Sequence, residues 1–266
     1  MKNSSATFFK FVLKVEDIPR NPINLISQLS IVFVGAYSFI FLARRATLKG
    51  VKFFGETFEA HYNSKGQLDL LHIPIPEEEK VIKYNEDGKE IDDSIFGTLN
   101  GFFILSLIGL VIAIYVDFSI VGKLALFTFH TLSFGPLLGL TMIQIDENDG
   151  LKAVILTLLI TLLAGFLALY LEIDFSGLLN FLFYPLLLLI LFGIARIFYT
   201  FESSTIRWSA LSGILIFILF LLADFSILSK ASENGINDWN TAFIIAFQIY
   251  LDIINLLLQI LDAMGN

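Results

Sequence analysis

Two aspartates lie inside long apolar stretches of the sequence, where an ionisable side chain is costly. Asp224 stands in "LFLLADFSILSK" and Asp252 in "FQIYLDIINLLLQIL". A carboxylate at the centre of a bilayer costs ~2.5–3.5 kcal/mol on insertion scales, so such residues generally face a bundle interior and carry function. Around Asp252, polar residues recur at spacings of 4, 3, 4 and 3, which places them on one helical face. They are Gln248, Asp252, Asn255, Gln259 and Asp262. This stripe predicts a helix that is central in its bundle or lines a wet cavity.

The two acids lie on consecutive apolar segments that we expect to be antiparallel. Asp224 lies six residues before Lys230, and Asp252 lies 13 residues after Trp239. At 1.5 Å per residue these positions are about 9 Å and about 20 Å from the connecting loop. Both carboxyl groups can therefore occupy the same half of a bundle, where a meeting pair would share protons. Three interpretations stay open: a cation or proton site, a protonated structural pair, and two acids that never meet.

Two further residues are candidates for lining such a site. Of the three histidines in the sequence, His130 is the one within an apolar run, "FTFHTLSFGPLLGLT". The imidazole side chain titrates near physiological pH. It either lines a pore or, more simply, forms an interhelical hydrogen bond with a Ser or Thr. Asp117 lies on the same membrane face as the loop after Asp224, as a pore-mouth residue or a solvated loop acid. The sequence has no H-E-x-x-H motif, and its three histidines make no zinc set. We therefore expect no enzyme and no bound cofactor.

The composition predicts an all-α polytopic membrane protein embedded in a lipid bilayer. The chain is 56% hydrophobic, with a mean hydropathy of +0.78 and no cysteine, which excludes thiolate metal sites. Apolar runs of about 20 residues, long enough to cross ~30 Å of hydrocarbon, recur along it. We expect seven transmembrane helices with the seventh central, at about 24–43, 98–116, 122–145, 152–171, 176–198, 207–228 and 239–261. The first run lacks a small-residue cleavage motif, so we expect no cleavable signal peptide.

Outside these runs the sequence predicts two smaller parts. Residues 1–23 read as an interfacial N-terminal segment, with 24–43 as the first transmembrane helix. Residues 53–98 carry −7 of the net charge of −8, and residues 44–97 contain short strand patterns separated by "NSKGQ" and "NEDGKE". We expect a small β-rich soluble insertion there, and the six-helix remainder of the bundle in 98–266. No basic stripe suggests a nucleic-acid partner.

Basic residues are nearly balanced between the two sides of the predicted bundle, so charge alone does not orient the protein. The alternation of spans still fixes relative positions. The N-terminus and the loops near 117–122, 172–176 and 230–238 share one face. The 44–97 segment and the C-terminus share the other.

Three motifs resemble the Bax inhibitor-1 family, also called the transmembrane Bax inhibitor motif (TMBIM) family. "FQIYLDIINLLLQIL" is similar to its C-terminal signature, "LADFSILSK" to the end of its sixth span, and "LSFGPLLGLT" to its third-span glycine-proline segment. The resemblance covers about 99–262. It implies that the seventh helix is surrounded by the other six and that Asp224 and Asp252 form a pH-sensitive pair associated with calcium leak. It also implies a cytoplasmic N-terminus.

The sequence departs from that family in two places. The 44–97 insertion is unusually long, and Asp117 stands roughly where members often carry a base that can pair with the sixth-span aspartate. The resulting hypothesis is a pH-sensitive calcium (cation) leak channel in a plasma or inner membrane, with Ca²⁺ and H⁺ as the ions handled. In it, Asp224 and Asp252 form the ion, proton and calcium site. The supporting polar lining comprises Gln248, Asn255, Gln259, Asp117 and His130. The alternatives are a non-conducting regulator of a membrane protein partner and a proton-coupled cation exchanger.

Overall fold

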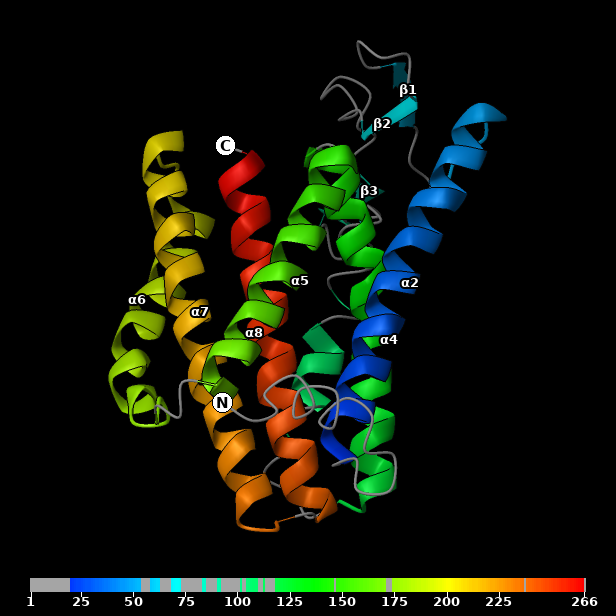
Figure 1. The fold of residues 1–266 in the computed structure, drawn as a ribbon. Helices are drawn as coiled ribbons and strands as arrows, with labels where there is room; N and C mark the ends of the chain where they lie inside the picture. The colour runs from blue at the N-terminus through cyan, green and yellow to red at the C-terminus, as the bar shows by residue number, and fades with distance from the viewer. Residues whose placement is uncertain are drawn as a thin grey trace. The chain divides into compact units, whose positions relative to one another are not determined.

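Six long helices make up most of the computed structural model, which describes part of the chain. The described residues are 20–53, 58–62, 68–72, 83–84, 90–91, 101, 104–109, 112, 118–145, 147–170, 174–236 and 238–265. The long helices are α2 (Arg20–Leu48), α4 (Ile120–Ile145), α5 (Glu147–Tyr170), α6 (Leu178–Phe198), α7 (Ser203–Glu233) and α8 (Trp239–Gly265) (Figure 1). Of the predicted interfacial segment, residues 1–23, the first 19 lie outside the described residues.

The expected count of seven transmembrane helices is wrong for the described residues, which contain six helices long and apolar enough to cross a membrane. Six of the predicted runs each coincide with one of these helices. The exception is the run 98–116, of which only 101, 104–109 and 112 are described, all helical. The fold class is therefore corrected to six candidate spans in the described chain.

The expected β-rich soluble insertion also needs correction. Between α2 and α4 the structure describes four short strands: β1 (Phe58–Tyr62), β2 (Leu68–His72), β3 (Lys83–Tyr84) and β4 (Glu90–Ile91). They form two separate antiparallel hairpins rather than one sheet, and β2 lies against α4. Helix α2 also continues to Leu48, into the predicted insertion. A segment so rich in acids has too few apolar side chains for a second layer, and two-stranded hairpins are marginal alone. The turn signals thus predicted hairpins better than they predicted a domain.

The chain divides into two compact units, which we describe separately. One unit contains 158–259 together with residues up to 27. The other contains 28–157 and 260–266. The divisions fall inside α2, α5 and α8, so these helices contribute residues to both units.

In the first unit, a tight turn joins α7 to α8. Gly235 has a left-handed φ of 68°, which favours glycine, and its N–H donates to the carbonyl of Ser232 at 3.1 Å. Asp238 then begins α8, with its Oδ1 accepting hydrogen bonds from the backbone N–H groups of Asn240 and Thr241, both at 3.0 Å. The bond from Thr241 lowers the pKa of Asp238. The turn makes α7 and α8 antiparallel neighbours.

The loop before α6 lies at the same end of this unit as the α7–α8 turn. The Lys230 ammonium donates to Asp174 Oδ2 at 2.6 Å and to the Ser176 hydroxyl at 3.0 Å. The bond from Lys230 is the main reason that the pKa of Asp174 is lowered to about 2. The prediction that the loops near 172–176 and 230–238 share one face is therefore confirmed.

In the second unit, α2 and α4 approach so closely that only small residues fit between them. A Cβ atom on Gly139 would lie 2.6 Å from the Ala36 carbonyl oxygen, and one on Gly135 would lie 3.1 Å from the Gly35 Cα. Backbone approach through paired glycines is a common way for membrane helices to pack. Pro136, next to Gly135, does not interrupt α4, which continues to Ile145.

The helices differ widely in how much of their surface the protein covers. The apolar window of α8 is 67% buried, the highest value among the six candidate spans, whereas that of α6 is 6% buried. The large apolar side chains that α6 exposes therefore contact lipid. The position of α8 relative to the whole set of helices stays a prediction, although its burial is consistent with an interior helix.

Candidate ion site

Asp224 of α7 and Asp252 of α8 meet within the first unit. Both residues are buried, with 3% and 8% of their surface exposed. A side-chain hydrogen bond joins their carboxyl groups. A hydrogen bond between two carboxyl groups requires a proton on one of them, so the arrangement is that of a proton-sharing pair. Of the three interpretations left open by the sequence, the one in which the acids never meet is wrong.

The pair has no basic partner in the part of the chain that is described. Within that part, neither acid forms an ion pair with Lys or Arg, and the neighbouring Leu221 and Ile253 are apolar and buried. The Oδ2 atom of Asp252 is buried without a hydrogen-bond partner among the described residues. An isolated buried carboxylate costs several kcal/mol unless a proton or cation compensates it. The pair is therefore suited to take up a proton or a cation.

Part of the polar stripe of α8 is accessible, although its central residue, Asp252, is buried. Gln248 is exposed, and Asn255 and Gln259 are half-buried, whereas most other residues between 242 and 261 are buried. The Asn255 Nδ2 donates to the Leu251 carbonyl at 2.8 Å, so its amide nitrogen is satisfied by its own helix while its Oδ1 is left to accept from elsewhere. A polar face at membrane depth is stable when it borders water rather than lipid. We therefore expect the polar residues on the accessible side of α8 to border water or other polar groups.

The Asp224–Asp252 pair is better suited to bind a cation transiently than to hold a metal ion tightly. The described residues contain no group of three or more His, Cys, Asp or Glu that could hold a metal ion. Two carboxyl groups offer at most four oxygens, whereas Ca²⁺ takes six to eight. A cation beside Asp224 and Asp252 would keep part of its hydration shell or use amide oxygens of the stripe. Such partial coordination is compatible with release.

His130 belongs to the second unit, whereas Asp224 and Asp252 belong to the first. Its Nδ1 lies 3.1 Å from the Ser106 hydroxyl, and its ring stacks on Phe134 with centroids 6.3 Å apart. This is the interhelical hydrogen bond that the sequence analysis gave as the simpler alternative, and a pore-lining role for His130 stays a prediction. Asp117, the predicted mouth residue, lies outside the described residues.

Sequence reasoning missed a second set of buried polar groups. In the second unit, the Gln28 Nε2 donates to the Thr128 hydroxyl at 3.1 Å, and the Thr131 hydroxyl donates to the Gln28 Oε1 at 2.8 Å. In the first unit, the Thr161 hydroxyl is buried without a partner among the described residues. Threonine is common in apolar helices, where it bonds to its own backbone, so its sequence signal is weak. In the sequence, the signal for this set of buried polar groups was Gln28, a polar residue within a long apolar run.

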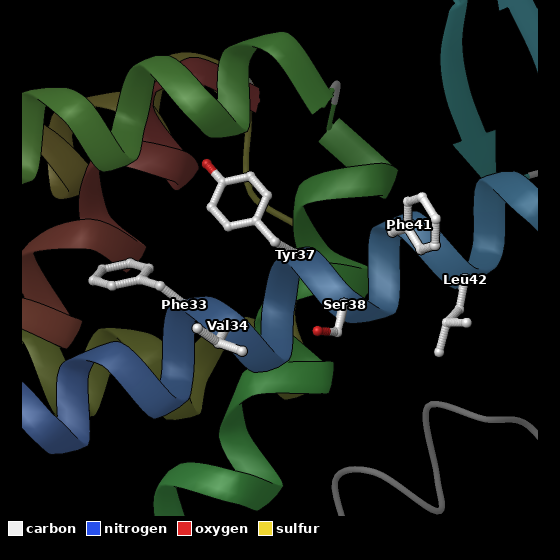
Figure 2. Close-up of a pocket in the computed structure, with 6 residues that line it drawn as sticks. All are labelled: Phe33, Val34, Tyr37, Ser38, Phe41 and Leu42. Carbon is white, nitrogen blue, oxygen red and sulfur yellow. The ribbon is translucent and has the colours of Figure 1, made fainter.

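A shallow hollow on α2 is unrelated to the acid pair. Six residues of that helix line it, and their side chains are drawn in Figure 2. They are Phe33, Val34, Tyr37, Ser38, Phe41 and Leu42. The lining contains no acid or base, and Phe41 is largely exposed. This hollow matches a lipid-facing surface rather than an ion site.

Several apolar helices of spanning length, one of them with a polar face, define an integral, multi-pass membrane protein that contacts lipid. A family model supports the same class. The model described as "Inhibitor of apoptosis-promoting Bax1" matches residues 84–266, more than half of the chain. The chain therefore belongs to the Bax inhibitor family, and the resemblance found in the sequence is confirmed. No curated protein matches the chain.

Proposed function

We propose that the protein is a pH-sensitive cation leak channel that conducts calcium, with Asp224 and Asp252 as its proton-sharing latch. The observation that carries the proposal is the buried carboxyl pair with no basic partner among the described residues and with an unsatisfied Oδ2 on Asp252. Burial of ionisable groups in a membrane protein generally marks an ion or proton pathway. In this proposal the protein has no enzymatic role, and its N-terminus is cytoplasmic.

The latch works through the charge of the pair. With one shared proton, a hydrogen bond holds α7 and α8 together and the pair carries a single negative charge. Loss of that proton leaves two like charges in a poorly polarisable environment, where their repulsion is strong. The α7–α8 contact is then biased toward separation, and the freed carboxylates attract a cation. Low pH stabilises the closed arrangement, and higher pH favours leak.

Calcium flux into proteoliposomes across a pH series tests this proposal. The wild type is compared with Asp224→Asn and Asp252→Asn, which keep the side-chain size but cannot ionise. Asp174→Asn is the matched control, because Asp174 is an exposed loop acid of the same unit. Unaltered flux and pH dependence in both pair variants would sink the proposal. Flux that needs a counter-ion gradient would instead identify an exchanger.

A further inference from the structure

Gln259 of α8 lies directly on the backbone of α7 at Gly213. A Cβ atom added to Gly213 would collide with the Gln259 Oε1 and lie 2.8 Å from its Cγ, closer than Cβ atoms approach in proteins. Glycine weakens a helix interior by about 1 kcal/mol relative to alanine. With glycine at 213 the Gln259 side chain can lie against the α7 backbone, whereas a larger residue there would require that side chain to shift.

Helices α7 and α8 run side by side (Figure 1), and both this contact and the acid pair join them. Asp252 meets Asp224, and Gln259, further along α8, meets Gly213, further back along α7. Seven residues separate Asp252 from Gln259, which is two helical turns or about 10 Å. Asn255 lies between them on the same face of α8. Side-chain oxygens therefore recur about once per turn along this face.

Gln259 is only half-buried, as is Asn255, whereas Leu257 on the opposite side of α8 is fully buried. Neutral amide oxygens are ligands that Ca²⁺ accepts, and they add no charge to the membrane interior. They supply what two carboxyl groups lack, which is further oxygen ligands for an ion that has left part of its water behind.

We propose that Gln259, positioned by Gly213, is a second cation-binding station in series with the Asp224–Asp252 pair, reached through water along α8. The inference rests on the proposed function, because it names a further ligand on the same path. Gln259 offers its amide oxygen to the ion. Gly213 touches no ion and is a positioning residue, because it sets where that amide lies.

Cysteine accessibility tests the station without relying on flux, since the native chain contains no cysteine. Gln259→Cys is made in the full-length protein, reconstituted in vesicles and treated with a small cationic methanethiosulfonate. Leu215→Cys is the matched control, because Leu215 is two residues from Gly213 on the far side of α7 and is 59% exposed, so that it faces lipid. A wet, negatively charged path makes the thiol of Gln259→Cys react at least about tenfold faster than that of Leu215→Cys. Added Ca²⁺ slows the reaction of Asn255→Cys, which lies one turn away and keeps the Gln259 amide, and slows it less when Gln259→Ala is added. The reaction of Leu215→Cys is unchanged by Ca²⁺.

The positioning role of Gly213 is tested in an Asn255→Cys background, where the native Gln259 is kept. Adding Gly213→Ala drives the Gln259 amide off α7 and changes the reaction rate of the thiol introduced by Asn255→Cys several-fold. Adding Gln259→Ala as well removes the collision and restores the rate. Gly193→Ala, on α6 in open space, leaves the rate unchanged. Thermal unfolding midpoints of all variants show that each remains folded.

The outcomes separate this inference from the proposed function. Equal rates for Gln259→Cys and Leu215→Cys, or Ca²⁺ protection of Asn255→Cys that is absent or that Gln259→Ala leaves unchanged, would overturn the station even if the wild type conducts calcium. An unchanged rate for Asn255→Cys after Gly213→Ala is added would overturn the positioning role. Calcium protection of Asn255→Cys that depends on Gln259, in a protein without measurable flux, would support the station and contradict the leak channel.

Discussion

The two units each bury a polar cluster, but only one cluster is satisfied by its own hydrogen bonds. In the second unit, Gln28 bonds to Thr128 and Thr131, and His130 bonds to Ser106. In the first unit, two carboxyl groups share one hydrogen bond, and an oxygen of Asp252 has no partner in the described chain. Both clusters lie among apolar helices of spanning length.

The difference indicates which cluster stabilises the fold and which one acts. Satisfied polar groups fix how helices pack and resist change. An unsatisfied acid pair is costly unless a proton or ion compensates it, so its arrangement responds to pH and to cations. We therefore propose that the hydrogen-bonded groups around Gln28 and His130 serve packing and that the Asp224–Asp252 pair handles ions.

The largest expected effect is on flux through the acid pair. Asp224→Asn and Asp252→Asn each change calcium flux at neutral pH by at least about fivefold, the usual lower range of coupling between linked sites. Because the carboxyl groups act as a unit, the double variant changes flux no more than either single variant. A double-mutant cycle of flux measures this. Additive effects would mean that the two acids act separately.

A large effect on stability is expected where α2 and α4 touch. Gly139→Ala places a methyl group against the Ala36 carbonyl and lowers the free energy of unfolding by about 1–3 kcal/mol through overpacking. Gly193→Ala, with nothing within 4 Å of the added atom, is the control and gains helix propensity. Thermal unfolding in detergent compares the two. Equal midpoints would show that the close approach does not stabilise the fold.

The packing assignment is tested at Ser106. Ser106→Ala removes a hydrogen-bond partner of buried His130 and costs about 1–2 kcal/mol of stability. The pH dependence of calcium flux should keep its shape in this variant. Ser133→Ala, on the same helix as His130, is the control because the Ser133 hydroxyl bonds to its own helix at Phe129. A shifted pH profile in Ser106→Ala alone would give His130 a share in gating.

The smallest effect is expected at the exposed contact between Asp174 and Lys230. The pKa of Asp174 is lowered from 3.8 to about 2, so the contact stabilises the folded protein above about pH 4. This contribution is lost as the pH falls through the folded pKa. The unfolding midpoint of Asp174→Asn should therefore lie slightly below that of the wild type at about pH 5 and converge with it near pH 2. A difference that persists at the lower pH would contradict this assignment.

The sequence was most informative where periodicity and burial cost act together. The spacing of Gln248, Asp252 and Asn255 predicted a single helix face, and the short loop after Asp224 placed both acids in neighbouring helices. The contact between Gly213 and Gln259 could not be predicted, because it depends on the crossing of two helices rather than on either sequence. Among the described residues, hydropathy predicted one span more than the structure contains, and the strand patterns predicted a β-rich insertion where the structure has two separate hairpins, because local signals do not report tertiary packing.

The most direct test of the central claim is the rate of calcium entry into proteoliposomes as a function of pH, for the wild type and the Asp224→Asn, Asp252→Asn double variant. The acid pair predicts that wild-type entry rises with pH as the shared proton is lost and that the double variant gives a flat profile. A wild-type profile that is flat, or a double variant that keeps the wild-type pH dependence, would contradict the assignment of the latch to this pair.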